Sequence, residues 1–279
     1  MIAPWQEVGD GCYRRRYDSY DLNIGVVRGA DALLVFDTRC HGGEVAELLD
    51  ELRVFDARSI RWVVNSHWHF DHTFGNAAVR AAAPRAEIWG HRVMRDELVR
   101  WSEERVERLA RERPEWRDEL DGIEIVPPDH LVDDVARVDL GDREVELRHF
   151  GPAHTGGDLV LFADDDRVVF AGDLVEEGAP PAIGLDAHVF DWPVSNGVML
   201  ERIAADATVV PGHGDVVDRA FVVEQQNVLA TVAATIRDLY DAGVAAEDAL
   251  EEGRGRWPYA EDDLCDAIPC GYAELGGTA

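Results

Sequence analysis

Four side chains that can bind a metal ion lie within six residues of this sequence. They are His67, His69, Asp71 and His72, spaced as His-x-His-x-Asp-His. Imidazole and carboxylate groups are ligands that a borderline cation such as Zn²⁺ accepts. One short loop cannot direct all four at a single ion, so we expect the first two to face one ion and the last two another. The remaining ligands must then come from later in the chain.

Three later segments place a ligand-type residue in a glycine-containing turn after an apolar run. The residues are His154, Asp173 and His213, in the contexts Gly-Pro-Ala-His-Thr-Gly-Gly, Ala-Gly-Asp and Pro-Gly-His-Gly. Glycine allows the backbone to turn sharply and to approach a site closely. Strand ends give the rigid placement that a metal centre needs. These residues are therefore candidates for the missing ligands.

The seven residues divide into two three-ligand sites and one bridging carboxylate. The ligands are His67, His69 and His154 for one ion, Asp71, His72 and His213 for the other, and Asp173 between them. Three protein ligands leave a position for water, as in catalytic zinc sites. Two ions about 3.5–4 Å apart lower the pKa of a shared water towards ~7. We predict two Zn²⁺ ions, with Fe or Mn as possible replacements, and a catalytic role for Asp71 and Asp173 in orienting the nucleophile.

Strands that end at one edge of the fold are needed to bring these residues together. Apolar runs and their flanking turns predict strands over 32–36, 60–64, 86–89, 159–163, 167–173 and 207–210. Helical spacing of apolar residues predicts helices over 44–53, 73–83, 195–205, 219–241 and 246–252. Alternation of strand-rich and helical segments indicates two β layers flanked by helices.

Two regions are expected to add to this framework within a single domain over 1–279. Residues 91–130 are dense in Arg and Glu, with apolar residues at helical spacing. They predict a helical insert, which is either a mobile lid over the substrate or a solvated surface. Residues 218–279 predict a helical C-terminal extension.

The composition excludes several classes of partner. The net charge is −29, and all 27 basic residues are Arg, so the mean field repels polyanions and argues against nucleic acid. No apolar run reaches the length of a membrane span, and the first ten residues lack the pattern of a secretory signal. We expect a cytoplasmic protein, a monomer or homodimer, that acts on a small molecule. The four cysteines are expected to be free thiols, and the sequence assigns no role to Cys265 and Cys270.

The order and context of the seven candidate ligands resemble those of the metallo-β-lactamase-fold hydrolase superfamily. The resemblance covers residues 10–215 and implies an α+β fold, a four-layer αβ/βα sandwich with the dinuclear site at one edge. It also implies that Asp37 is a buried residue beside the metal loop that orients ligands through hydrogen bonds. His188 lies in a later loop and is a further candidate for contact with the site.

Within the superfamily, the ligand set favours some branches over others. Asp173 occupies the place where some true zinc β-lactamases carry a metal-binding cysteine, and His69 stands where flavo-diiron proteins have glutamate. The glyoxalase II-like and lactonase-like branches remain, which implies that a metal-bound hydroxide attacks a small ester, thioester or lactone. Two alternatives stay open on the same fold: a metal-dependent phosphodiesterase or nuclease, and an iron-dependent oxygenase.

Overall fold

The structure is a computed structural model that describes residues 5–55 and 59–276. A seven-stranded sheet forms the first half of the molecule. Its strands follow the order of the sequence. They are β1 (Gln6–Gly9), β2 (Cys12–Arg16), β3 (Asn23–Arg28), β4 (Ala32–Phe36), β5 (Ser59–Val64), β6 (Glu87–His91) and β7 (His130–Val132). β1 to β4 pair antiparallel, whereas β4 to β7 pair parallel. The parallel strands therefore end at one edge, where the His-rich segment begins.

A five-stranded sheet forms the second half, in the order β12-β11-β10-β9-β8. Its strands are β8 (Val135–Asp139), β9 (Glu144–Arg148), β10 (Val160–Ala163), β11 (Val168–Glu176) and β12 (Thr208–His213). Only β11 and β12 pair parallel. These two neighbours carry Asp173 and His213, so both residues lie towards the same edge of this sheet.

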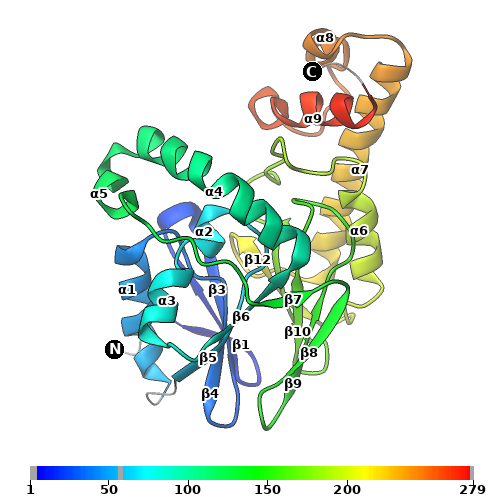
Figure 1. The fold of residues 1–279 in the computed structure, drawn as a ribbon. Helices are drawn as coiled ribbons and strands as arrows, with labels where there is room; N and C mark the ends of the chain where they lie inside the picture. Colours follow the sequence, from blue (N-terminus) through cyan, green and yellow to red (C-terminus); the bar gives the residue numbers. More distant parts are fainter. Residues whose placement is uncertain (1–4, 56–58, 277–279) are drawn as a thin grey trace.

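Three buried apolar clusters separate four layers, in which the two sheets lie between helices (Figure 1). Phe36 and Trp62 of the first sheet meet Leu147 and Phe170 of the second in the central cluster. The outer face of the first sheet packs on α1 (Gly42–Glu51) and α3 (Asn76–Ala82). The outer face of the second packs on α6 (Trp192–Leu200) and α7 (Arg219–Asp241). The predicted αβ/βα sandwich is confirmed.

The helices within residues 91–130 cover the edge at which the ligand-bearing strands end (Figure 1). α4 (Arg92–Glu112) is followed by a 3₁₀ turn (Pro114–Trp116) and α5 (Arg117–Leu120). Met94 and Leu98 of α4 pack with Trp68 and Phe70 in one buried cluster. The two end residues of the range belong instead to the first sheet, as His91 closes β6 and His130 opens β7.

The C-terminal helices pack on the far end of α7. They are α8 (Ala246–Glu252) and α9 (Ala267–Glu274), joined to α7 by the same cluster that contains Ile236, Leu264 and Tyr272. All four cysteines are free thiols, as predicted, with Cys265 exposed and Cys270 buried. Residues 1–4 and 277–279 lie outside the described residues. The first of these ranges contributed to the expectation of a cytoplasmic protein. In the described part, no helix is long and apolar enough to span a membrane.

The helix predicted over 73–83 is wrong in its boundaries. The structure has two helices here, α2 (Phe70–Thr73) and α3, separated by Phe74 and Gly75. A Cβ atom on Gly75 would overlap the backbone oxygen of Thr38, so the chain breaks where it passes closest to the loop after β4. The helix predicted over 195–205 instead begins at Trp192 and ends at Leu200. It has Pro193 in its first turn, where proline loses no helical hydrogen bond.

Candidate metal centre

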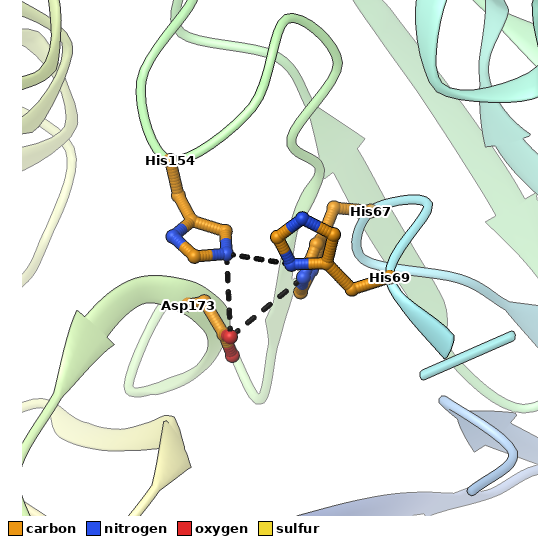
Figure 2. Close-up of side chains that lie close together, drawn as sticks. All are labelled: His67, His69, His154 and Asp173. Carbon is orange, nitrogen blue, oxygen red and sulfur yellow. Dashed lines mark hydrogen bonds and ion pairs between the residues drawn. The ribbon is translucent and has the colours of Figure 1, made fainter. Parts of the chain in front are cut away.

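The seven predicted ligands come together at the edge between the two sheets. Within each group, one donor atom of every residue lies within 4.8 Å of the others. The groups are His67, His69, His154 and Asp173, and Asp71, His72 and His213. In Figure 2 the four members of the first group converge from three separate segments of the chain. The six other candidates fall into the same two sets as in the prediction, and Asp173 groups with the first set.

Asp173 faces histidines of both groups. Its Oδ2 atom lies 3.5 Å from Nε2 of His154 and 3.7 Å from Nε2 of His67, both in the first group. The same oxygen lies 3.2 Å from Nε2 of His213 in the second group. Its Oδ1 atom lies 3.3 Å from Nε2 of His72. One carboxylate thus reaches both sets of donors, which is the position of a bridging ligand.

Three of the histidines are held by an acceptor on the side facing away from the centre. His72 Nδ1 lies 2.8 Å from Asp37 Oδ2, and His213 Nδ1 lies 2.7 Å from the carbonyl oxygen of Tyr20. His69 Nε2 lies 2.9 Å from Asp186 Oδ2. An ionised carboxylate or a carbonyl can only accept, so each of these nitrogens donates its proton. In the neutral ring the opposite nitrogen then presents a lone pair to the centre, as a metal ligand must.

The unpaired atoms of the centre fit a pair of cations. Among the described residues, His67 Nε2, His72 Nε2 and Asp173 Oδ1 are buried without a hydrogen-bond partner. Buried polar atoms are almost always paired, so each exception requires an explanation. All three face the space between the two ligand groups, and nitrogen and carboxylate oxygen are suitable donors for zinc, iron or manganese. The residues present therefore suit two divalent metal ions.

Burial and neighbouring charges shift the pKa values of the candidate ligands, and the direction differs from one ligand to another. Burial alone would raise the pKa of Asp173, but His213, His72 and His67 hold it well below its ordinary value. Burial lowers the pKa of His213, yet Asp173 outweighs it and raises that pKa to about 10. Burial, reinforced by the charge of His72, holds the pKa of His67 well below its ordinary value. The protein thus holds an ionised carboxylate and a neutral imidazole ready for cations.

Asp37 and Ser66 fix the start of the His-rich segment. Asp37 follows β4 with a φ of 68°, and its carboxylate accepts hydrogen bonds from the backbone N–H of Ser66 at 2.7 Å and from its hydroxyl at 2.8 Å. The Ser66 hydroxyl also lies 3.0 Å from Nδ1 of His67. Asp37 therefore lies where the family resemblance implies. Ser66 is a contact that the sequence did not reveal, because a serine beside a histidine has no distinctive pattern.

Two side-chain amides and two glycines complete the support of the ligands. Asn65 and Asn76 bond each other through both amides at 3.1 and 2.8 Å, and Asn65 also donates to the carbonyl of His72. Gly172 has a φ of +54°, and a Cβ there would lie 2.6 Å from the Cβ of Ser66. A Cβ on Gly212 would overlap Oδ1 of Asp173. Glycine is required at both positions because backbone and ligand approach too closely for a side chain.

Asp186 is the functional candidate that sequence reasoning missed. It lies in the loop between β11 and α6, and its Oδ2 atom accepts hydrogen bonds from Trp68 Nε1 and His69 Nε2, both at 2.9 Å. Burial would raise the pKa of Asp186, but the hydrogen bond and charge of His69, with the charge of His154, hold it well below its ordinary value. His188, which was predicted from the same loop, lies beside Gly156 instead. The ligand environment thus depends on an aspartate two positions before the predicted histidine.

Replacing Asp186 with alanine should weaken metal binding without removing a ligand. His69 would lose the acceptor that fixes its tautomer and its ring orientation, so we expect metal affinity and turnover to fall about 10- to 100-fold. Competition with a chromogenic chelator measures the affinity directly. The Asp191→Asn variant, an exposed carboxylate at the start of α6, should match the wild type. Equal metal affinity in the Asp186→Ala variant and the wild type would contradict this role.

A cavity of about 640 Å³ opens onto the metal centre. It is lined by five of the seven candidate ligands, namely His69, Asp71, His154, Asp173 and His213. Its other walls include Tyr20 and Phe70, the loop at 178–184, Arg105 of α4, and Arg113 just after α4. Glu176 also lines the cavity. Its burial, together with the nearby charge of Asp173, raises the pKa of this carboxyl to about 8. A larger hollow of about 860 Å³ lies elsewhere, against α1 and α3, and contains none of the ligands.

A family model described as the metallo-beta-lactamase superfamily matches residues 20–213, which include all seven candidate ligands. The chain belongs to the metallo-β-lactamase superfamily. It is 30% identical over 225 residues to acyl-coenzyme A thioesterase MBLAC2 of Gallus gallus, an alignment that covers 74% of this chain and 78% of the relative. The human protein of the same name is 30% identical over 192 residues, covering 62% and 67%.

Solved structures agree with this assignment at the level of the fold. A metallo-beta-lactamase from Pontibacter korlensis superposes with a TM-score of 0.61 at 18% identity, covering 81% of this chain and 98% of that one. The family predicted from the ligand pattern is confirmed. The prediction that the protein is a hydrolase of this superfamily is confirmed with it. The two curated relatives are named as thioesterases, in agreement with the prediction that the chain is not a true β-lactamase.

Proposed function

We propose that this chain is a dinuclear metal-dependent hydrolase that cleaves an acyl thioester. The observation that carries the proposal is the position of Asp173, whose two oxygens lie 3.2 to 3.7 Å from histidine nitrogens of both ligand groups. The thioesterase names of the relatives support a thioester within the predicted range of esters, thioesters and lactones. We also propose zinc as the metal, a small-molecule substrate and a cytoplasmic location.

Metal ions would be held by His67, His69 and His154 on one side and by Asp71, His72 and His213 on the other, with Asp173 shared. Bound there, such ions lower the pKa of water to near 7 and polarise a carbonyl oxygen. Asp71 and Asp173 both line the cavity, and each carboxylate can accept a hydrogen bond from an attacking water and orient it. Tyr20 and Phe70, whose ring centroids are 5.2 Å apart, supply an apolar wall for the acyl group.

Metal content and substrate preference test this function together. Protein reconstituted with zinc should contain about two ions per chain and should hydrolyse acyl thioesters faster than lactones or phosphodiesters of similar size. Addition and removal of metal should switch the activity on and off. Thioester turnover that persists after complete removal of metal, or a preference for phosphodiesters in the two-metal form, would contradict the proposal.

A further inference from the structure

The wall of the cavity opposite the strand ends is positively charged, although the chain as a whole carries −29. This wall is formed by the C-terminal half of α4, which crosses the ligand-bearing edge (Figure 1) and contributes Arg105 to the cavity lining, and by Arg113, the residue that follows α4. A net negative protein repels anions from most of its surface. Cationic side chains at the mouth of the site would therefore favour the entry of negatively charged substrates.

Arg105 lines the cavity and lies over an aromatic ring rather than beside a carboxylate. Its guanidinium lies 4.5 Å from the ring centroid of Phe70, and Phe70 stands between the ligands His69 and Asp71. Stacking on a ring uses the flat face of the guanidinium and leaves the N–H groups of its edge free to donate. Among the described residues, no carboxylate forms an ion pair with Arg105. An anion in the cavity is the partner that this arrangement lacks.

Arg113, at the end of α4, is placed in a similar way. Its guanidinium lies 5.5 Å from the ring centroids of both Tyr20 and Trp116. Its ion pair with Glu115 is long, at 3.9 Å, and both side chains are about half exposed, so the pair stabilises little. Eight residues of helix place the two arginines about 12 Å apart along the axis of α4. This separation suits an extended anionic group.

The other arginines of this helix differ. Four of them form ion pairs with acidic neighbours, namely Arg92, Arg95, Arg108 and Arg111. Glu112 also lines the cavity, but its Oε1 atom lies 2.6 Å from Nε of Arg108, which is its first partner. Arg100 has no ion pair among the described residues either, but it lies over the ring of Trp101 and does not line the cavity. Arg105 and Arg113 are therefore the two cations of this segment that line the cavity without a carboxylate partner closer than 3.9 Å.

We propose that Arg105 and Arg113 bind an anionic group on the thiol side of the thioester substrate. The thioester linkage is neutral, so in a substrate with an uncharged acyl group the carrier of the thiol supplies the negative charge. Phosphates and carboxylates both carry several accepting oxygens, and the N–H groups along the edge of a planar guanidinium can donate to two of them at once. The phosphates of coenzyme A and the carboxylates of glutathione are the two sources to distinguish. This inference rests on the proposed thioesterase function.

The test compares three thioesters with one acyl group, carried on coenzyme A, on glutathione and on uncharged pantetheine. In the Arg105→Gln and Arg113→Gln variants, kcat/KM should fall about 10- to 100-fold for one or both charged carriers, mainly through KM. It should change less than about twofold for the pantetheine thioester. Loss with coenzyme A identifies phosphate as the ligand, and loss with glutathione identifies carboxylate. Equal loss for all three carriers would overturn the proposal.

Two further measurements separate this inference from the proposed function. Arg111→Gln removes a charge from the same helix at an exposed position that pairs with Glu107, and it should leave all three substrates unchanged. Calorimetric titration of free coenzyme A and free glutathione should show salt-dependent binding that is lost in Arg105→Gln but not in Arg111→Gln. If the wild type hydrolysed no thioester, the proposed function would fail while this binding could still be measured. If the wild type bound neither thiol, the inference would fail on its own.

Discussion

An Asp173→Ala variant should lose essentially all hydrolytic activity and at least one of the two metal ions. The carboxylate faces Nε2 atoms of four histidines, His67, His72, His154 and His213. Without it, Asp71 would be the one carboxylate of the described residues left facing these Nε2 atoms, 3.6 Å from those of His72 and His213, and neither proposed metal site would be complete. We expect kcat/KM to fall by about 10³-fold or more, measured with metal content by atomic emission on the same preparations.

Two comparisons separate this loss from general damage to the fold. Asp173→Asn preserves the shape of the side chain but removes its charge, so it should also lose metal and activity. Asp248→Asn alters an exposed carboxylate in the first turn of α8 and should behave as the wild type. Circular dichroism verifies that all three proteins are folded. An Asp173→Ala variant with two bound metal ions and normal turnover would show that this residue does not bridge the ions.

Removal of metal should lower the thermal stability of the protein as well as abolish hydrolysis. Ligands that bind only the folded state stabilise it by mass action, by about 4 kcal/mol at a thousandfold excess over Kd. For a chain of this size, that corresponds to a decrease of about 10 °C in the melting temperature on chelation. Scanning calorimetry with and without chelator measures it, and addition of zinc should restore both properties.

The Asp173→Ala variant is also the reference for this second experiment. Because its metal sites are incomplete, its melting temperature should respond much less to chelator than that of the wild type. A wild-type protein whose melting temperature and activity both survive exhaustive chelation would contradict metal binding at this edge. A response of the same size in both proteins would show that the chelator acts elsewhere.

The seven candidate ligands can be picked out from the sequence because their signals are local. His67, His69, Asp71 and His72 lie close together, and the turns around Asp173 and His213 combine glycine with the end of an apolar run. Such runs become strands whose ends meet at one edge once the sheets form. The two sheets and most of the helices follow from the same periodicities.

The surroundings of the ligands were harder to predict because they depend on the path of irregular segments. His188 was the natural choice in the loop before α6, since histidine binds metals, but the loop directs Asp186 to His69 instead. An irregular loop has no repeating pattern of apolar residues that would indicate which of its side chains face inwards. Arg105 was hidden for a related reason: its stacking on Phe70 depends on how α4 lies across the edge. Hydrophobic spacing shows that a helix forms but does not show what it covers.

The loop that carries His213 is tied to residues near the N-terminus. Asn23 of β3 donates to the carbonyl of Pro211, 188 positions away, and to that of Gly214, while Arg14 of β2 contacts Gly214 and Asp215. The last candidate ligand is thus positioned by strands that leave the ribosome before it does. During synthesis, a chain that ends before β12 has the complete His-rich segment but lacks the residue that closes the second site. With the proposed two-metal centre, full metal loading would mark the point at which the two halves have joined, and metal uptake during translation would report the completion of the fold.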